Sequence, residues 1–334
     1  ILLANQLSAE FLEFIDNAEV LHVHSGETRH YSTTQASRIS VWSAKNCAFN
    51  QIIFTTYHSL HRIQESGIHV DTIYFDEAHN SVQKNFYQST EYFSNHAERC
   101  YFFTATPKHS RTPSKAGMNW TKTYGQVICQ VPAPKLVNQG YILPPKVEVY
   151  KTRILEKDEL VADRDSEQMI DAIDNLKKNK VLICAKSTKQ IVNLVAHTKF
   201  VSELAWRGYS YMLITSKTGA IIDGEKVTRE EFFDVLNAWG QDPDKRFVVL
   251  HHSILSEGMN VKGLEAVLFM RSMDYIGISQ TIGRVIRKGA KDKVFGLVCI
   301  PVYSKVGIST ATKVEAVVDT IFNKGEAATT VITR

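Results

Sequence analysis

The sequence predicts an α/β protein with two domains, each built on a parallel sheet that is flanked by helices. Short apolar runs rich in β-branched and aromatic residues alternate with longer stretches of helical periodicity, which is typical of βα units. The length of 334 residues is enough for about two domains of common size. Prolines cluster at 132–145, between two groups of strand-like runs, so we predict one domain at 1–140 and a second at 141–334.

The first domain is predicted to contain four complete strands and to be incomplete at its N-terminus. Residues 1–4 are apolar and follow neither an initiator Met nor a basic leader, so we interpret them as the end of a core strand that starts upstream. Residues 8–14 are expected to form a helix. The strand-like runs of this domain are 20–23, 51–54, 72–75 and 99–103.

The second domain is predicted from six further strand-like runs and one long amphipathic helix. The helix occupies the latter part of 155–180, where Leu160, Ile170, Ile173 and Leu176 recur at near-helical spacing and most of the charged residues are expected to face solvent. The strand-like runs are 146–150, 181–184, 211–214, 247–250, 266–269 and 295–299.

The composition excludes several classes of protein. With 44% hydrophobic and 22% charged residues the chain is neither disordered nor collagen-like, and no apolar run approaches the roughly 18–20 residues that cross a bilayer. The net charge of +4 permits a polyanionic partner without requiring one. The five cysteines form no C-x-x-C pair, so we expect buried free thiols of a reducing compartment, such as the cytoplasm of a bacterium or of a virus-infected cell.

Two carboxylates follow the strand-like run 72–75. The segment Asp76-Glu77-Ala78-His79 places them at the carboxyl end of a parallel strand, which is the edge where open α/β sheets bind ligands. At that edge Asp76 suits a Mg²⁺ that bridges nucleotide phosphates, and Glu77 suits the orientation of an attacking water. A surface acidic turn is the alternative for an isolated Asp-Glu pair. The four residues together resemble the DEAH form of motif II in superfamily-2 helicases and translocases.

A second segment resembles motif III of this superfamily. Thr104-Ala105-Thr106-Pro107 follows the strand-like run 99–103, about where the family places the motif that links nucleotide state to the grip on nucleic acid. A strand end that is terminated by proline is the alternative for this segment alone. The resemblance implies that His79, Thr104 and Thr106 couple hydrolysis to movement.

Three segments resemble the nucleic-acid contacts of the family. Residues 54–60 resemble motif Ib, which implies that Thr55 and Thr56 hold a phosphate of the bound strand, and residues 1–7 loosely resemble motif Ia. Lys186-Ser187-Thr188 stands where motif IV residues meet the backbone in relatives, which implies contacts from Lys186 and Ser187. A hydroxyl-rich strand end that caps the next helix explains the same residues equally well.

The second domain contains a pair of arginines three residues apart. On a helix this spacing puts both guanidinium groups on one face, where they can clamp a polyphosphate. The full segment 280–287 resembles motif VI, which implies that Arg284 and Arg287 are catalytic and that Gln280 and Gly283 contact the nucleotide. Residues 249–264 resemble motif V and imply nucleotide contacts for Gly258 and Asn260, although Asn260 and Lys262 replace the usual Asp and Pro.

One motif of such a motor is not found in this sequence. No G-x-x-x-x-G-K-[ST] segment is present to cradle the phosphates. The family carries it just upstream of motif Ia, so we expect the sequence to be truncated there and these 334 residues alone to hydrolyse ATP poorly or not at all. Outside these motifs, His22 and His24 share a strand face and offer two metal ligands, but a structural pair is the simpler interpretation.

The resemblance as a whole implies two RecA-like domains and an ATP-dependent helicase or translocase that uses Mg²⁺. Its partner would be nucleic acid, with DNA favoured over RNA, and no membrane. The subgroup it resembles includes restriction-enzyme motor subunits and phage or repair helicases. Two alternatives stay open: a nucleic-acid-binding platform that does not hydrolyse nucleotide, and a motor subunit that pumps duplex DNA without separating its strands.

Overall fold

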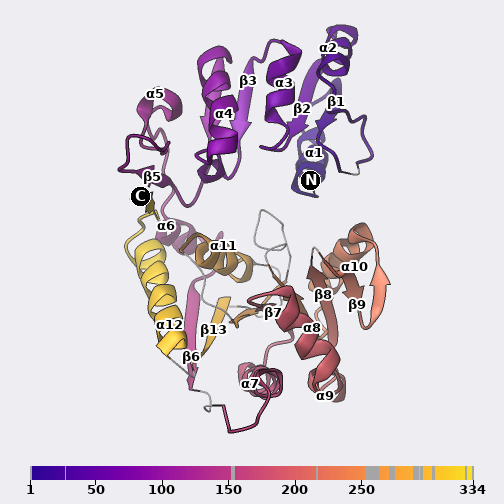
Figure 1. Cartoon of the computed structure of the whole chain (residues 1–334), viewed down its shortest axis with the longest axis vertical. Helices are drawn as coiled ribbons and strands as arrows, with labels where there is room; N and C mark the ends of the chain where they lie inside the picture. Colours follow the sequence, from indigo (N-terminus) through magenta and orange to yellow (C-terminus); the bar gives the residue numbers. More distant parts are fainter. Residues whose placement is uncertain are drawn as a thin grey trace. The chain divides into compact units, whose positions relative to one another are not determined.

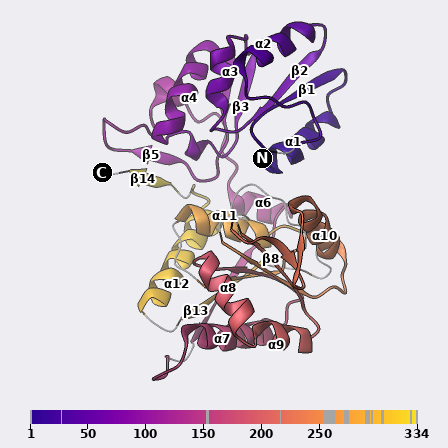
Figure 2. The same ribbon diagram turned by 45° about the vertical axis from the view of Figure 1, so that its right-hand side comes forward.

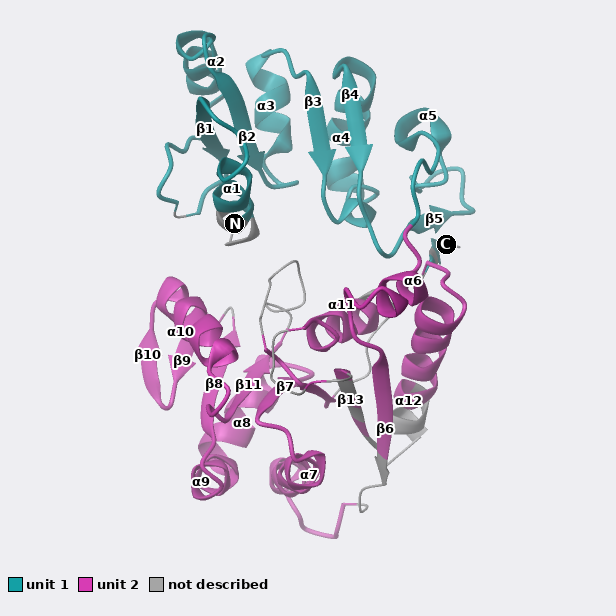
Figure 3. Cartoon of the chain, turned by 180° about the vertical axis from the view of Figure 1, so that it is seen from behind, with its two compact units in different colours: residues 1–130, 329–334 teal, residues 131–328 magenta. Residues whose placement is uncertain are grey.

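The computed structural model describes residues 2–26, 28–151, 155–215, 217–252, 263–270, 275–288, 293, 296–302, 305–327 and 329–332 (Figure 1). The chain forms two compact units, which are shown in different colours in Figure 3. Unit 1 comprises Ile1–Gln130 together with Thr329–Arg334, and unit 2 comprises Val131–Ala328. The assignment of 1–140 and 141–334 to an ATP-binding and a C-terminal helicase domain stays a prediction.

Unit 1 consists of parallel strand pairs with helices packed beside them (Figure 2). Strand β1 (Ala18–Val23) pairs with β2 (Asn50–Thr55), and β3 (Thr72–Phe75) pairs with β4 (Arg99–Phe102). These strands agree with the four predicted runs. The accompanying helices are α2 (Ala36–Lys45), α3 (Leu60–Ser66) and α4 (Lys84–His96). Their buried faces join the strands in one core that includes Leu21, Ile39, Trp42, Leu60, Phe75 and Phe93.

The prediction of a strand at the very start of the chain was wrong. Residues Leu2–Leu12 form one helix, α1. Ala4 and Ser8, four residues apart, are both buried, and the Phe11 ring packs edge-on against Phe54 with centroids 6.0 Å apart. A short apolar run does not distinguish a strand from a buried helix face, and here the helical period decides.

A short two-stranded parallel sheet completes unit 1. Strand β5 (Lys108–Ser110) follows the Thr104–Thr106 segment directly and pairs in parallel with β14 (Thr330–Ile332) from the other end of the chain. The helix α5 (Thr121–Tyr124) is joined to the end of the 3-10 turn η1 (Ala78–Asn80) by a hydrogen bond. It links the hydroxyls of Tyr124 and of Ser81, the residue that follows η1, which are 3.0 Å apart. Neither β5 nor β14 was predicted from the sequence.

Unit 2 is organised around one sheet whose strands run in the order β10-β9-β8-β11-β7-β12-β13-β6. All its neighbouring strands are parallel except in the hairpin that β8, β9 and β10 form at one edge. The strands are β6 (Pro145–Lys151), β7 (Lys180–Cys184), β8 (Ser210–Thr215), β9 (Gly219–Ile222), β10 (Glu225–Val227), β11 (Phe247–His251), β12 (Ala266–Phe269) and β13 (Gly296–Val302). Every residue of the central β7 and β11 is buried, which explains why residues 181–184 and 247–250 are continuous apolar runs.

The hairpin at the sheet edge was not predicted, although the sequence carries a signal for it. Asp223 and Gly224 link β9 to β10, and both have positive φ, 46° and 93°. An Asp-Gly pair between two short β-type runs is the usual composition of such a turn, since glycine adopts positive φ without steric cost.

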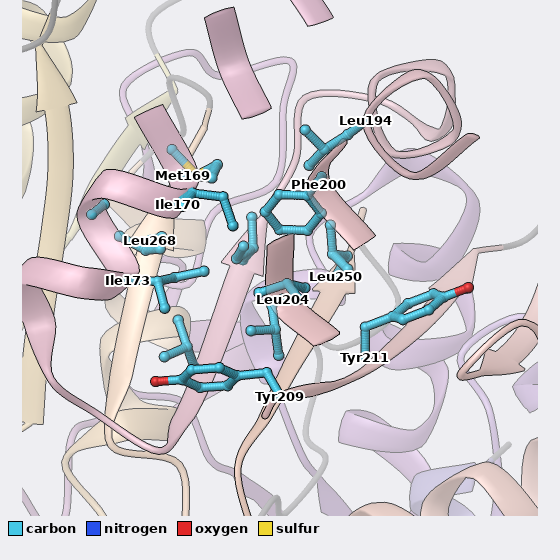
Figure 4. Packing of buried hydrophobic residues seen from close by; sticks show 14 of the residues in the cluster. Met169, Ile170, Ile173, Leu194, Phe200, Leu204, Tyr209, Tyr211, Leu250 and Leu268 are labelled. Carbon is cyan, nitrogen blue, oxygen red and sulfur yellow. The ribbon is translucent and has the colours of Figure 1, made fainter. Parts of the chain in front are cut away.

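Helices cover the sheet of unit 2 and form its core. They are α6 (Ala133–Asn138), α7 (Val161–Leu176), α8 (Thr188–His197), α9 (Phe200–Trp206), α10 (Arg229–Gln241), α11 (Tyr275–Val285), α12 (Lys305–Val318) and the π-helical η3 (Asp319–Asn323). Figure 4 shows Ile170 and Ile173 of α7 packed with Phe200, Leu204 and Leu268. Each such buried aliphatic side chain stabilises the fold by about 1.5–3 kcal/mol.

The predicted amphipathic helix is confirmed as α7, but two of its charged residues are not in solvent. Arg164 and Asp165 are only 6% and 5% exposed, and their side chains meet at 3.3 Å. The second Asp165 oxygen accepts a hydrogen bond from Gln190 Nε2 at 2.8 Å. The expectation of a mostly solvated charged face is confirmed for Glu167, Asp171 and Asp174, which are exposed, whereas Arg164 and Asp165 are buried where α8 packs against α7. Leu160 precedes the helix and is 68% exposed.

The cysteines are partly as expected. Cys184 is buried in β7, whereas Cys47 and Cys129 are exposed because they lie in irregular segments at the surface. The expectation that all thiols are buried was therefore wrong for these two. Among the residues that the structure describes, no helix combines the length and the apolar character that a membrane span requires.

Candidate functional site

The two carboxylates lie where the sequence places them, directly after β3. Asp76 is exposed, and its Oδ1 accepts a hydrogen bond from the Glu77 backbone N–H at 2.9 Å. Glu77 has φ 46°, in the left-handed region, which costs an L-residue roughly 1–2 kcal/mol. Such strain at a non-glycine residue concentrates at functional sites. The exposed carboxylate of Asp76 is the oxygen donor that suits a hard divalent cation such as Mg²⁺.

A buried histidine joins this segment to the next strand end. His79 is 5% exposed, and its Nδ1 lies 3.1 Å from Thr104 Oγ1 and 3.3 Å from Thr106 Oγ1. The same nitrogen lies 3.4 Å from Glu77 Oε2. One imidazole nitrogen thus meets the carboxylate of one predicted motif and both hydroxyls of another. We call these four residues the His79 cluster.

Backbone hydrogen bonds hold the two strand ends in this register. The Phe103 N–H donates to the Phe75 carbonyl at 2.9 Å, and the Ala78 N–H donates to the Phe103 carbonyl at 2.8 Å. The Thr106 N–H in turn donates to Thr104 Oγ1 at 3.1 Å. A displacement of either strand end would therefore be transmitted to the other.

Tyr57 belongs to this site and was not singled out in the sequence. Its hydroxyl donates to the Asp76 backbone carbonyl at 2.8 Å, and its ring stacks on Phe75 with centroids 6.1 Å apart. Burial, followed by the nearby Asp76 charge, raises the pKa of the phenol, so it stays protonated as a donor. It lies two residues after β2, within the segment 54–60 that resembles motif Ib.

The neighbouring threonines are only partly available for a ligand. The Thr55 hydroxyl donates to the Val23 carbonyl at 3.0 Å and so ties the end of β2 to β1. The Thr56 carbonyl accepts the Ser59 N–H at 2.9 Å and thereby starts the turn into α3. The two residues lie at the carboxyl end of β2, as predicted.

The predicted arginine pair is not on one helix. Gln280, Gly283 and Arg284 lie on α11, and Arg284 is 4% exposed. The helix ends at Val285, and Arg287 instead forms an isolated β-bridge with Ile142. The Arg287 carbonyl accepts a hydrogen bond from Lys293 Nζ at 2.8 Å. The shared helix face was therefore a wrong prediction, because the backbone turns into this bridge before the second arginine.

The remaining predicted residues divide into two groups. Ser187 caps α8, since its hydroxyl accepts the Gln190 N–H at 3.2 Å, while the side chain of Lys186 is exposed. The capping interpretation of Ser187 is thus observed in the structure. The predicted nucleotide contacts Gly258 and Asn260 lie outside the described residues.

The histidines near the end of β1 form a compact stack. His22 Nδ1 lies 3.0 Å from His24 Nε2, and His30 stacks on the His22 ring with centroids 5.1 Å apart. Since the His24 Nδ1 accepts the Gly26 N–H at 3.2 Å, its Nε2 carries the proton and donates to His22. Burial lowers the pKa of His22 to about 4. The pair is thus neutral and packed within unit 1.

Comparisons with known proteins agree with this architecture. Residues 1–109 match the family model described as type III restriction enzyme, res subunit. No curated protein sequence gave a significant match.

The solved structures that the chain resembles include two restriction-modification enzymes and a nucleotide-bound RNA complex. The fold is similar to that of the ATP-dependent Type ISP enzyme LlaBIII bound to DNA, with TM-score 0.69, 16% identity, and coverage of 95% of this chain and 26% of that one. The Type ISP enzyme LlaGI in complex with a DNA substrate mimic has a TM-score of 0.64 and 18% identity. The match covers 99% of this chain and 25% of that one. Mss116p bound to single-stranded RNA and AMP-PNP has a TM-score of 0.60 and 13% identity. The match covers 99% of this chain and 62% of that one.

The chain spans about a quarter of the length of the first two enzymes, 26% and 25%. Its parallel sheets flanked by helices are RecA-like, as the sequence predicted. Residues 1–109 match the res-subunit family model, and the chain as a whole shares its fold with these solved structures.

Proposed function

We propose that this chain is the motor part of an ATP-dependent nucleic-acid translocase. The observation that carries the proposal is the His79 cluster, in which His79 Nδ1 lies 3.4 Å from the Glu77 carboxylate and 3.1 Å from Thr104 Oγ1. A carboxylate that orients water must respond to the state of the bound nucleotide. The buried imidazole offers a direct route from that carboxylate to the strand end at Thr104–Thr106.

The site residues would divide the chemistry of phosphoryl transfer. Asp76 would hold the Mg²⁺ that accompanies ATP, and Glu77 would orient the attacking water and accept its proton. Bound ATP supplies the energy of hydrolysis, and Mg²⁺ supplies neutralising charge at its phosphates. Arg284 would neutralise phosphate charge from a fixed position, since it is buried on α11. We assign Arg287 to charge neutralisation, Gln280, Gly258, Asn260 and Gly283 to nucleotide contacts, and Thr55, Thr56, Lys186 and Ser187 to nucleic-acid contacts.

The proposed track is DNA. Support comes from the res-subunit match of residues 1–109 and from the likeness to two restriction-modification enzymes whose structures contain DNA or its mimic. A translocase of this kind need not separate strands. Strand-displacement and triplex-displacement assays distinguish a helicase, which displaces the paired strand, from a duplex pump, which displaces only the third strand.

The experiment that tests the proposal is the substitution Glu77→Gln in the full-length protein that carries these residues. The amide keeps the size of the side chain but cannot accept a proton, so we expect nucleic-acid-stimulated ATPase activity to fall by about 10²–10⁴-fold. Glu65→Gln is a matched control, because Glu65 is exposed and pairs only with Arg62 among its described contacts, at 3.0 Å. Unchanged ATPase in the Glu77 variant would remove the proposed role.

A second candidate function is a nucleic-acid-binding platform that does not hydrolyse nucleotide. One observation favours it: Asn260 stands where the resembled motif V has Asp. Such a platform would bind nucleic acid with an affinity that ATP does not change. A motor would change that affinity on binding ATP, so titration with and without ATP separates the two.

A further inference from the structure

A basic segment of unit 1 has no role in the proposed chemistry. Between Glu98 and Val131 the chain contains no acidic residue, although its overall net charge is only +4. The basic residues of this segment are Arg99, Lys108, Arg111, Lys115 and Lys122. Such a one-sided charge distribution is typical of a surface that meets phosphates.

A shallow pocket lies in the middle of this segment. It has a volume of about 400 Å³ and is lined by Ser110, Arg111, Thr112, Pro113 and Trp120. The pocket thus combines an exposed guanidinium, two residues with hydroxyl groups and an indole ring. These are the groups that hold a phosphate and stack on a base.

Hydrogen bonds hold the loop that forms the pocket in place. The Asn119 side chain accepts the Ser110 N–H at 2.8 Å and donates to the Ser110 carbonyl at 2.9 Å, and the Met118 N–H donates to the Lys108 carbonyl at 2.8 Å. A Cβ on Gly117 would come within 2.3 Å of the Ser110 nitrogen, so only glycine permits this close approach. The Arg111 N–H donates to the Ile332 carbonyl of β14 at 3.0 Å. Binding to such a preformed loop sacrifices little chain entropy.

Arg111 is the one charged residue among those that line the pocket. Trp120 packs edge-on against Tyr87 of α4, with ring centroids 5.8 Å apart. Glu91 accepts a hydrogen bond from the Tyr87 hydroxyl at 3.1 Å. Glu91 does not line the pocket.

We propose that this pocket binds one nucleotide unit of a single-stranded nucleic acid, with Arg111 on a backbone phosphate and Trp120 stacked on a base. Lys108 and Lys115 add charge along the path of the strand. The proposal rests on the proposed function and adds a contact site that none of the motif resemblances includes. Because β5 begins two residues after Thr106, the pocket is attached to the strand end that contacts His79. The grip on the strand is thereby connected to the His79 cluster.

The test compares Arg111→Glu with Arg38→Glu in the full-length protein. Arg38 is an exposed residue of α2, which lies at the far side of unit 1 from α5 (Figure 3), so its reversal changes the net charge equally. Binding of fluorescein-labelled single-stranded DNA and RNA 20-mers is followed by anisotropy at several salt concentrations, and thermal unfolding confirms that each variant is folded. We expect Arg111→Glu to weaken binding about tenfold or more and to lower the salt slope by about one, whereas Arg38→Glu stays within about twofold.

A second readout reports the stacked base. Binding of a strand should quench the fluorescence of Trp120, and Trp120→Phe should remove that component of the quench. If Arg111→Glu binds as tightly as Arg38→Glu while the unmodified protein binds well, the pocket is overturned and the proposed function survives. If the unmodified protein binds duplex DNA but neither single-stranded 20-mer, the pocket alone is overturned. If it binds no oligonucleotide, single-stranded or duplex, in any nucleotide state, both the pocket and the proposed function are overturned.

Discussion

The hydrogen bond between His79 and Thr106 should carry a measurable coupling energy. Thr106 is 1% exposed, and its hydroxyl lies 3.3 Å from His79 Nδ1. Thr106→Val removes this hydroxyl at nearly constant volume and should destabilise unit 1 by about 1–3 kcal/mol, since it leaves a buried polar partner. His79→Ala also removes the contacts to Thr104 and Glu77 and should cost about 2–4 kcal/mol. The double variant should lose less than the sum, by about 0.5–1.5 kcal/mol.

The assay is urea unfolding followed by tryptophan fluorescence. Trp206→Phe and Trp239→Phe remove the reporters of unit 2, so that Trp42 and Trp120 report unit 1 alone. The control cycle pairs His79→Ala with Thr90→Val, because the buried Thr90 hydroxyl donates to the Phe86 carbonyl of its own helix at 3.0 Å. Additivity of the His79 and Thr106 changes within about 0.3 kcal/mol would refute the cluster as an energetic unit.

Three further outcomes are expected. A Cβ at Gly283 would meet no heavy atom within 4 Å, so Gly283→Ala should stabilise α11 by up to about 1 kcal/mol in thermal unfolding. A stable Gly283→Ala variant with lower ATPase activity would support the proposed nucleotide contact of Gly283, and unchanged ATPase activity would argue against it. Burial lowers the pKa of His22 from its ordinary 6.5 to about 4, so between pH 6.5 and 4 the unfolded chain binds a proton that the folded chain does not. The free energy of unfolding should therefore fall by up to about 3 kcal/mol as the pH is lowered through this range. A free energy of unfolding in urea that does not change with pH over this range would contradict this. Tyr57→Phe leaves the Asp76 carbonyl without its 2.8 Å donor and should cost about 1 kcal/mol, and a loss below about 0.3 kcal/mol would show that water replaces the phenol.

The sheets were predictable from the sequence because their strands are locally distinct. The strand-like run at β3 ends at Asp76, so the position of the strand and the place where the carboxylates follow it were both predicted correctly. The contact of His79 with Thr104 was not predicted, but it fits the two motifs, since parallel neighbouring strands end at the same edge of a sheet.

Other features depend on tertiary structure that periodicity does not encode. The apolar start of α1 is compatible with either a strand or a helix, and contact with β1 and β2 selects the helix. Arg287 was predicted on a helix face from its spacing alone, but the helix ends at Val285 and Arg287 instead pairs with Ile142 in a β-bridge. The left-handed backbone of Glu77 has no composition signal, because that conformation usually favours glycine.

The most direct test of the central claim is the ATPase rate of the full-length protein in the presence and absence of nucleic acid. Single-stranded DNA, duplex DNA and RNA are supplied separately at saturating ATP and Mg²⁺. The proposed motor predicts a rate that rises at least about tenfold with DNA and less with RNA, which would also identify the track. A folded protein that binds DNA yet shows no ATPase with any of the three would contradict the motor and favour the binding platform.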